Sequence, residues 1–315
     1  MSTGYLAALG TLFAWTISTF VLAKLSRLTN PYSLNKAALF FSIFLLGILV
    51  CILDGLTPWQ LVSLPGPSNW LWLGISGILG KSVGDYCGFC ALRILGARRR
   101  SMITTLGPGF TWMSGLFILN EEMNWVGVIA MFFTLIFLIL LINSTAEKNE
   151  VKKENYGLPL HGLLFGIAGA VLTGLAFILS KKTFVETGNT ISAFHGTWIR
   201  IIIAFLALML FDLGRNKHND FIMQFVFDKQ KATLLFLGIL FGAVLGLSFS
   251  LIAITSMNAV VAYTIFSLLP VPVILVSVIV YKKKVTIQSW IYSILSIAGV
   301  MVMIWRDDLI KYFSS

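Results

Sequence analysis

Ten apolar segments, each about twenty residues long, fill most of this 315-residue sequence. A helix of that length crosses the hydrocarbon core of a bilayer, whereas barrel strands are shorter and alternate apolar with polar residues. Only 11% of the residues are charged and the mean hydropathy is +0.89. We therefore predict an all-α polytopic membrane protein with ten transmembrane helices, over residues 5–23, 34–53, 70–92, 101–119, 125–143, 159–180, 194–211, 233–254, 259–280 and 287–305.

Motifs for enzymatic chemistry are missing from the sequence. It has no zinc signature, nucleophile elbow or Gly-rich phosphate loop. Cys87 and Cys90 form a CxxC pair without a nearby histidine or further thiol, which favours a packing role over a metal or redox role. The first apolar segment lacks a preceding basic region and a cleavage site, so it is predicted to be retained as a helix. Neither a cofactor nor an enzymatic activity is expected.

Basic residues are distributed unequally between the two sides of the predicted spans. When loops are assigned alternately to the two sides, 17 of the 23 Lys and Arg residues fall on one side. Lys and Arg accumulate in cytoplasmic loops, so this side is predicted to be cytoplasmic and both termini extracytoplasmic, in the cell membrane. The 17 residues are Lys24, Arg27, Lys36, Arg93, Arg98, Arg99, Arg100, Lys148, Lys152, Lys153, Arg215, Lys217, Lys229, Lys231, Lys282, Lys283 and Lys284.

The two halves of the sequence repeat one another. Residues 70–143 align without a gap with residues 232–305, at a shift of 162 positions, and the matched pairs include Gly80 with Gly242 and Pro108 with Pro270. Each half has five spans, so the second half enters the membrane from the opposite side. Such inverted-topology repeats are the architecture of secondary transporters. The predicted organisation is a first repeat (1–143), a polar linker (144–158), a second repeat (159–305) and a short polar tail (306–315).

Several stretches of sequence resemble one transporter family. They are FAWTISTFVLAK in the first span, CALRILGARRRSMITTLGPGF and LNEEMNWVG in the first half, and AITSMNAVVAYTIFSLLPVPV and YKKKVT in the second half. These stretches resemble the drug/metabolite transporter superfamily, specifically its ten-helix EamA-type members. The resemblance implies a carrier for small metabolites, usually an exporter, with a central cavity lined by the first, third, fourth, sixth, eighth and ninth spans. It also implies cytoplasmic termini, which is opposite to the orientation that the charges predict.

Lys81 and Asp85 are the most informative pair of charges. They lie four residues apart within the third span, and therefore on one helix face, whereas the repeat positions are Ala243 and Leu247. A charge inside a span normally faces a bundle interior or a watery cavity and has a partner. The pair could be a self-neutralising structural element or part of a substrate site. Asp85 is the candidate for proton coupling because no other carboxylate lies well inside a predicted span.

Further candidate site residues are cationic or aromatic. Arg98, Arg99 and Arg100 precede the fourth span, where a helix N-terminus favours anions, and one or two of them can face a cavity. The triplet could instead serve only as a topology anchor. Arg98 and Arg99 are the preferred members because they lie nearest the expected first turn. Arg200 lies inside the seventh span and needs a carboxylate, carbonyl or substrate anion, and the candidates for the cavity wall are Trp15, Tyr86 and Tyr263.

These features predict a secondary transporter for a small polar, anionic or zwitterionic metabolite, working by alternating access in export or exchange. A lipid flippase or a channel-like protein on the same fold is the alternative. The expected partners are a small-molecule metabolite and the lipid bilayer, with no nucleic acid and no metal. The oligomeric state is expected to be a monomer or a homodimer.

Overall fold

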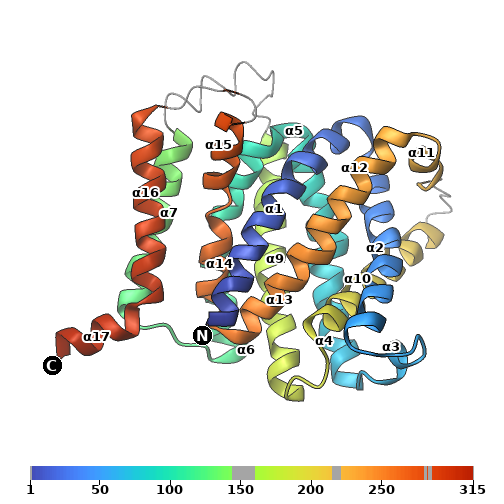
Figure 1. Cartoon of the computed structure of the whole chain (residues 1–315), viewed down its shortest axis with the longest axis horizontal. Coiled ribbons are helices and arrows are strands. Elements are labelled where there is room, and N and C mark those ends of the chain that lie inside the picture. The colour runs from blue at the N-terminus through green and yellow to red at the C-terminus, as the bar shows by residue number, and fades with distance from the viewer. Residues whose placement is uncertain (1, 144–159, 215–220, 280–281, 283–285, 315) are drawn as a thin grey trace.

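The computed structural model describes residues 2–143, 160–214, 221–279, 282 and 286–314, and these residues form helices without any β-strand. The helices stand side by side as a bundle, with both chain ends at its lower edge (Figure 1). The predicted linker, residues 144–158, lies outside the described residues. The fold class predicted from the sequence, a polytopic all-α protein, is confirmed.

The first half begins with two long helices, α1 (Ser2–Leu28) and α2 (Pro31–Leu53), followed by the short helix α3 (Gln60–Ser63). The third predicted span is built from three consecutive pieces: α4 (Pro67–Gly77), the π-helix η1 (Ile78–Gly84) and the first part of α5 (Asp85–Ile103). A 3₁₀ turn, η2 (Thr104–Leu106), joins α5 to α6 (Gly107–Leu119), and α7 (Trp125–Asn143) ends this half.

The second half has the same order of elements. It begins with α9 (Leu160–Thr187), α10 (Ala193–Gly214) and the short helix α11 (Met223–Val226). The eighth span consists of α12 (Lys229–Ile239), the π-helix η3 (Leu240–Gly246) and α13 (Leu247–Ser256). The chain continues through α14 (Ala259–Ser267), α15 (Pro270–Ile279) and α16 (Ile287–Ile304). The predicted polar tail forms a further helix, α17 (Arg306–Ser314).

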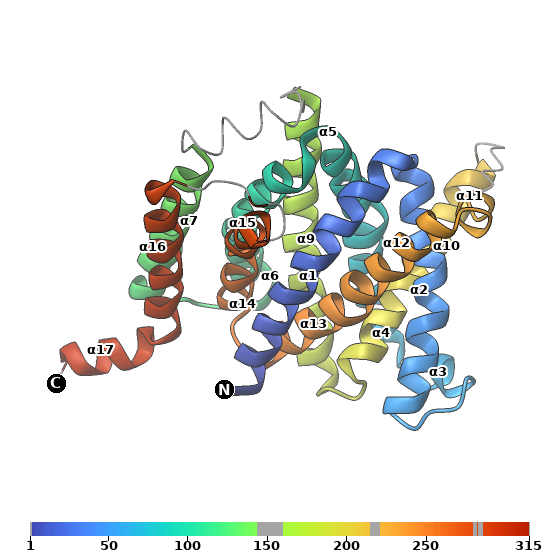
Figure 2. The same ribbon diagram turned by 45° about the horizontal axis from the view of Figure 1, so that its top comes forward.

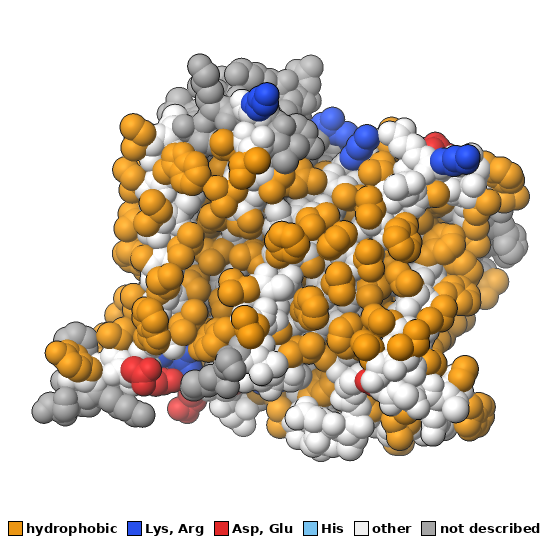
Figure 3. Space-filling view, viewed as in Figure 1, with side chains coloured by type: hydrophobic (Ala, Val, Ile, Leu, Met, Phe, Trp, Pro, Cys, Tyr) orange, Lys and Arg blue, Asp and Glu red, His pale blue; other side chains and the backbone are white. Residues whose placement is uncertain are grey.

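Eight described helices are long and apolar enough to cross a membrane, and α7 contributes a shorter apolar stretch, Trp125–Leu141. The third predicted span is not among them, and it is the span that carries Lys81 and Asp85. Apolar side chains cover the middle of the face shown in Figure 3, with most of the visible Lys and Arg along its upper edge and most of the visible Asp and Glu near its lower edge. This banding suits a bundle that spans a bilayer.

The two halves interlock through their first helices. In the second half α9 packs against α4, η1, α5 and α6 of the first half, while α1 packs against α12, η3, α13 and α14 of the second. Helices α7 and α16 pack on each other and stand at one side of the bundle in both ribbon views (Figures 1 and 2). The central helices of both halves therefore surround the middle of the molecule.

The turn between the third and fourth spans depends on one glycine. Gly96 interrupts α5 with a φ of 80°, a left-handed conformation that glycine adopts without the steric cost of a Cβ. At the corresponding turn of the second half, Asn258 caps α14 by accepting hydrogen bonds from the backbone N–H groups of Val260 and Val261. Residues 97–103 therefore begin the fourth span, and Arg98, Arg99 and Arg100 lie in its first turn.

Candidate functional site

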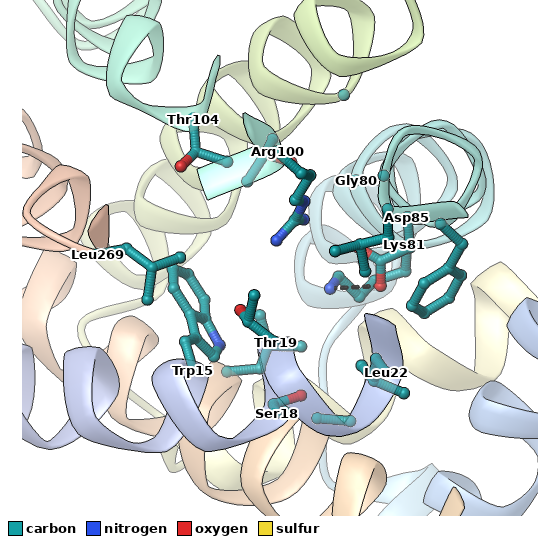
Figure 4. Close-up of a pocket in the computed structure, with 18 of the residues that line it drawn as sticks. Trp15, Ser18, Thr19, Leu22, Gly80, Lys81, Asp85, Arg100, Thr104 and Leu269 are labelled. Atoms are coloured by element: carbon teal, nitrogen blue, oxygen red, sulfur yellow. Dashed lines mark hydrogen bonds and ion pairs between the residues drawn. The ribbon is translucent and has the colours of Figure 1, made fainter. Parts of the chain in front are cut away.

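A cavity of about 140 Å³ lies in the middle of the bundle. Its wall contains side chains from α1, η1, α5, α9, α10, η3 and α14, and Figure 4 shows polar groups pointing into it from several of these elements. Small residues such as Gly88, Gly166 and Gly242 keep the wall open. The charged and hydroxyl-bearing lining residues are Ser18, Thr19, Lys81, Asp85, Arg100, Thr104, Thr173, Arg200 and Tyr263.

Lys81 and Asp85 form an ion pair on the cavity wall. Lys81 Nζ donates to Asp85 Oδ2 at 2.7 Å, and the side chains are 14% and 27% exposed, respectively. Lys81 lies in the π-helix η1, where regular i→i−4 hydrogen bonding is interrupted. Asn35 on α2 supports this turn because its Nδ2 donates to the carbonyl oxygens of Lys81 and Ser82, at 3.1 and 2.8 Å. Sequence analysis missed this positioning role, since Asn35 is 46 residues from Lys81.

Arg200 enters the cavity from α10. Its side chain is 1% exposed, and its guanidinium carbon lies 5.8 Å from the ring centre of Phe177. Nε and Nη1 of Arg200 are buried without a hydrogen-bond partner in the described part of the chain. A buried guanidinium with free donors is costly unless an anion or water satisfies it. Two donors of Arg200 are therefore left without the carboxylate, carbonyl or anion expected from the sequence, within the described part of the chain.

Arg100 is the member of the arginine triplet that lines the cavity. Its Nη2 would lie 3.1 Å from a Cβ placed on Gly88, so the absence of a side chain at Gly88 makes room for the guanidinium. The wall does not include Arg99, and the side chain of Arg98 lies outside the described residues. Among the described side chains, the structure thus places Arg100 on the cavity wall and not Arg99, which was one of the two arginines preferred from the sequence. Spacing alone could not show which member the turn at Gly96 directs inward.

Aromatic side chains form one part of the cavity wall. The rings of Trp15, Phe177, Tyr263 and Phe266 contact one another, with centroids 5.3 to 6.3 Å apart. Tyr263 lies in the middle of α14 and Phe266 in its last turn, and this helix begins at the same edge of the bundle as the chain termini. Trp15 and Tyr263 line the cavity. Tyr86 does not, because its ring lies between Tyr32 and Phe165.

The terminal side of the bundle carries a polar cluster beyond the aromatic rings. Lys181 Nζ on α9 donates to Glu121 Oε1 at 2.5 Å and to the carbonyl oxygen of Met257 at 2.7 Å. Glu121 also accepts the backbone N–H of Ala259, at 3.2 and 3.4 Å from its two oxygens. The α6–α7 turn, α9 and the α13–α14 junction are thereby joined across the two halves. We call these four residues the terminal-side cluster.

A second buried ion pair lies outside the cavity. Lys36, counted above among the loop residues of the basic side, is only 2% exposed and pairs with Asp212 of α10. Tyr32 Oη donates to Asp212 Oδ1 at 2.6 Å. Asp212 is therefore a second carboxylate with an ion pair inside the bundle, and it lies near the end of α10 rather than well inside a span. Asp212 escaped notice because it follows the predicted end of its span by one residue.

Comparison with known proteins assigns the chain to a family. The profile of the EamA-like transporter family matches residues 2–143 and again residues 160–305. The chain belongs to the EamA-like transporter family. The family resemblance inferred from the sequence is thus confirmed, and this family membership indicates a multi-pass membrane transporter.

Structural comparison gives the same fold. A solved structure described as "Crystal structure of protein" aligns with a TM-score of 0.68 and 18% sequence identity, over 96% of this chain and 96% of that chain. At this identity the similarity establishes the fold alone. A search among curated proteins found no match to this chain.

Proposed function

We propose that this EamA-family transporter carries a small polar metabolite with anionic character by alternating access. The observation that carries the proposal is the set of charges around the cavity: Lys81, Arg100 and Arg200 against the single carboxylate of Asp85. A low-dielectric site with excess positive charge attracts anions and disfavours cations. The free donors of Arg200 support the same conclusion, because a substrate oxygen could satisfy them.

The size and composition of the cavity favour a metabolite over a lipid. An apolar cavity of about 150 Å³ holds a molecule as small as benzene, and this cavity is similar in volume, at about 140 Å³. Its wall is mostly apolar but carries charged groups and hydroxyls from several helices. The flippase alternative would require space for a headgroup together with a path for acyl chains.

The different groups on the two sides of the cavity support alternating access. The terminal-side cluster joins the two halves on the side that holds the chain ends, and the aromatic rings line the cavity. Arg100 and Thr104, by contrast, lie near the opposite edge, where the fourth span begins. Inverted repeats support exchange between two such states because each half can adopt the conformation of the other.

Reconstitution into proteoliposomes tests the transporter proposal against its alternatives. Purified protein would be assayed for uptake of labelled small anions, zwitterions and cations, and for movement of labelled lipid between leaflets. We expect saturable uptake that is accelerated by unlabelled substrate on the opposite side. Lipid movement without solute uptake would support the flippase instead, and uptake without saturation or exchange would support a channel.

Proton coupling through Asp85 is the next part of the proposal. Asp85 lines the cavity and is 27% exposed, so protons and substrate can both reach it. We expect Asp85→Asn to remove the dependence of transport on an imposed proton gradient, measured at matched substrate concentrations. Transport by Asp85→Asn with unchanged pH dependence would leave Asp85 with only its ion pair to Lys81.

The orientation proposed from charge places the termini outside the cytoplasm. A single cysteine in the 144–158 linker, introduced into a variant lacking Cys51, Cys87 and Cys90, should resist an impermeant thiol reagent in intact cells. The same cysteine should react after the cells are opened. Labelling in intact cells would support the opposite orientation, which is the usual one in this family.

A further inference from the structure

We propose that the cavity binds a small dicarboxylate end to end, with one carboxylate on Arg200 and the other on Arg100. This inference rests on the proposed transport function and specifies its substrate class. It depends on the positions of the two guanidiniums along the third span, on the charge between them, and on the unpaired donors of Arg200.

Two glycines of one span show how far apart the arginines lie. A Cβ on Gly80 would be 3.4 Å from Nη2 of Arg200, and a Cβ on Gly88 would be 3.1 Å from Nη2 of Arg100. Gly80 and Gly88 are eight residues apart in a continuous run of π- and α-helix, which corresponds to a separation on the order of 10 Å along the helix axis. The guanidiniums therefore mark two ends of a site, too far apart to share one small anion.

Asp85 occupies the interval between these ends. Its carboxylate interacts electrostatically with Arg100 and with Arg200, and it pairs directly with Lys81. Because Lys81 and Asp85 neutralise each other, the two guanidiniums contribute an uncompensated charge of +2 to the cavity. A substrate with two negative charges would balance this excess in a low-dielectric setting, where an unbalanced charge is costly.

The distribution of charge distinguishes a dicarboxylate from other anions. Inorganic phosphate concentrates its charge at one centre and could contact only one guanidinium at a time. A monocarboxylate would leave the other guanidinium without a counter-ion. A dicarboxylate with a short carbon chain can place one planar carboxylate against each guanidinium, the geometry that arginine favours, while its chain passes the Lys81–Asp85 pair.

Binding to the purified full-length protein provides the test. The probes are malonate, succinate, glutarate, adipate and suberate, with butyrate, monomethyl succinate and inorganic phosphate as comparisons. We expect affinity to pass through a maximum at succinate or glutarate, and to be at least tenfold weaker for butyrate, monomethyl succinate and phosphate. Equal affinity for succinate and butyrate, or tightest binding of phosphate, would overturn the dicarboxylate assignment.

Two variants test whether Arg100 and Arg200 bind the two carboxylates. Arg100→Gln and Arg200→Gln should each bring the succinate-to-butyrate affinity ratio close to one, because each removes one end of the site. The ratio is measured within one preparation, so a lower fraction of folded protein does not affect it. Arg93→Gln is the matched control, since Arg93 is exposed on α5 outside the cavity wall, and it should keep the wild-type ratio.

The conservative variants Arg100→Lys and Arg200→Lys cover the case in which Gln prevents folding. Each should keep an intermediate preference for succinate, because charge remains but the planar two-point contact is lost. A wild-type ratio in both Gln variants, or in both Lys variants if Gln prevents folding, would overturn the assignment to these residues. If folded wild-type protein binds and transports monocarboxylates as well as dicarboxylates, only this inference fails. If it transports no anion or zwitterion at all, the proposed function fails with it.

Discussion

The third and eighth spans occupy equivalent places in the two halves, yet only the third carries charged residues at its π-helix. Both contain a π-helix at the same repeat position, residues 78–84 in η1 and 240–246 in η3. Gly80 and Gly84 match Gly242 and Gly246 across the same shift of 162 positions. Lys81 and Asp85, however, correspond to Ala243 and Leu247. The π-helix is thus present in both halves, whereas the charged pair is present only in the first.

The turns that follow these spans differ in the same way. Arg98, Arg99 and Arg100 correspond to Val260, Val261 and Ala262, which are buried at the start of α14. Helix α14 begins beside Glu121, whose carboxylate accepts the backbone N–H of Ala259. The repeat position of Glu121 is Lys283, which lies outside the described residues. An apolar helix start therefore packs where the terminal side is closed, while a basic helix start lies beside the cavity.

Among the substitutions that probe this difference between the halves, removal of Lys81 should cause the largest loss of transport. Lys81→Ala leaves Asp85 without its partner, and an unpaired charge within a span costs about 2.5–3.5 kcal/mol. We expect transport to fall by up to about a hundredfold, because a charged contact to the substrate contributes about 1.5–3 kcal/mol and 1.4 kcal/mol corresponds to tenfold, while the protein still inserts. Uptake in proteoliposomes and the melting temperature in detergent would be measured together.

A double variant distinguishes charge imbalance from loss of a binding group. Lys81→Ala with Asp85→Ala should recover the melting temperature but not transport. Transferring the pair to the second half, by Ala243→Lys and Leu247→Asp on that background, should not restore transport, because the pair would then face the cavity from η3 and α13 rather than from η1 and α5. Recovery of transport by the transferred pair would show that the two spans are interchangeable.

Substitutions in the arginine triplet should have the next largest effect, which is a loss of substrate affinity. Arg100→Lys retains charge but loses the planar guanidinium, so substrate affinity should fall by an amount on the order of 1.5–3 kcal/mol, or roughly ten- to a hundredfold. Arg99→Lys should leave affinity unchanged, because Arg99 is not part of the cavity wall. Concentration dependence of uptake measures both. Loss of affinity in Arg99→Lys with none in Arg100→Lys would reverse this assignment.

Substitution in the terminal-side cluster should have the smallest effect on the protein. Its readout, the accessibility of the cavity from the terminal side, is the most specific. Glu121→Gln removes the ion pair with Lys181 but keeps an acceptor for Ala259, so we expect a stability loss of about 1–2 kcal/mol. The closed state should also be less populated. A cysteine at Thr19, in a background without native cysteines, should then react faster with a reagent supplied from the terminal side. An unchanged rate, with the variant folded, would exclude the cluster as part of the closure.

Long apolar segments and the duplicated pattern made the helical architecture readable from the sequence, because span length and repeat spacing depend on local chain properties. The π-helices were not predicted, since a single extra residue per turn leaves no distinct hydrophobic period. The pair of Lys36 and Asp212 joins residues 176 positions apart, a contact that only packing reveals. Charge in the cavity was predicted at Lys81, Asp85 and Arg200. Arg100 required the turn at Gly96, whose direction the sequence does not specify.

The uncompensated charge of the cavity has a consequence in a membrane that sustains a voltage. Moving one elementary charge through the full membrane potential involves about 2.3 kcal/mol per 100 mV. A cavity that reorients while holding a dianion moves no net charge, whereas an empty cavity moves its charge of +2 through part of the field. The loaded carrier would then be insensitive to voltage, and the return of the empty carrier would be accelerated or slowed by it. One-way transport should consequently depend on voltage, and exchange of one substrate molecule for another should not.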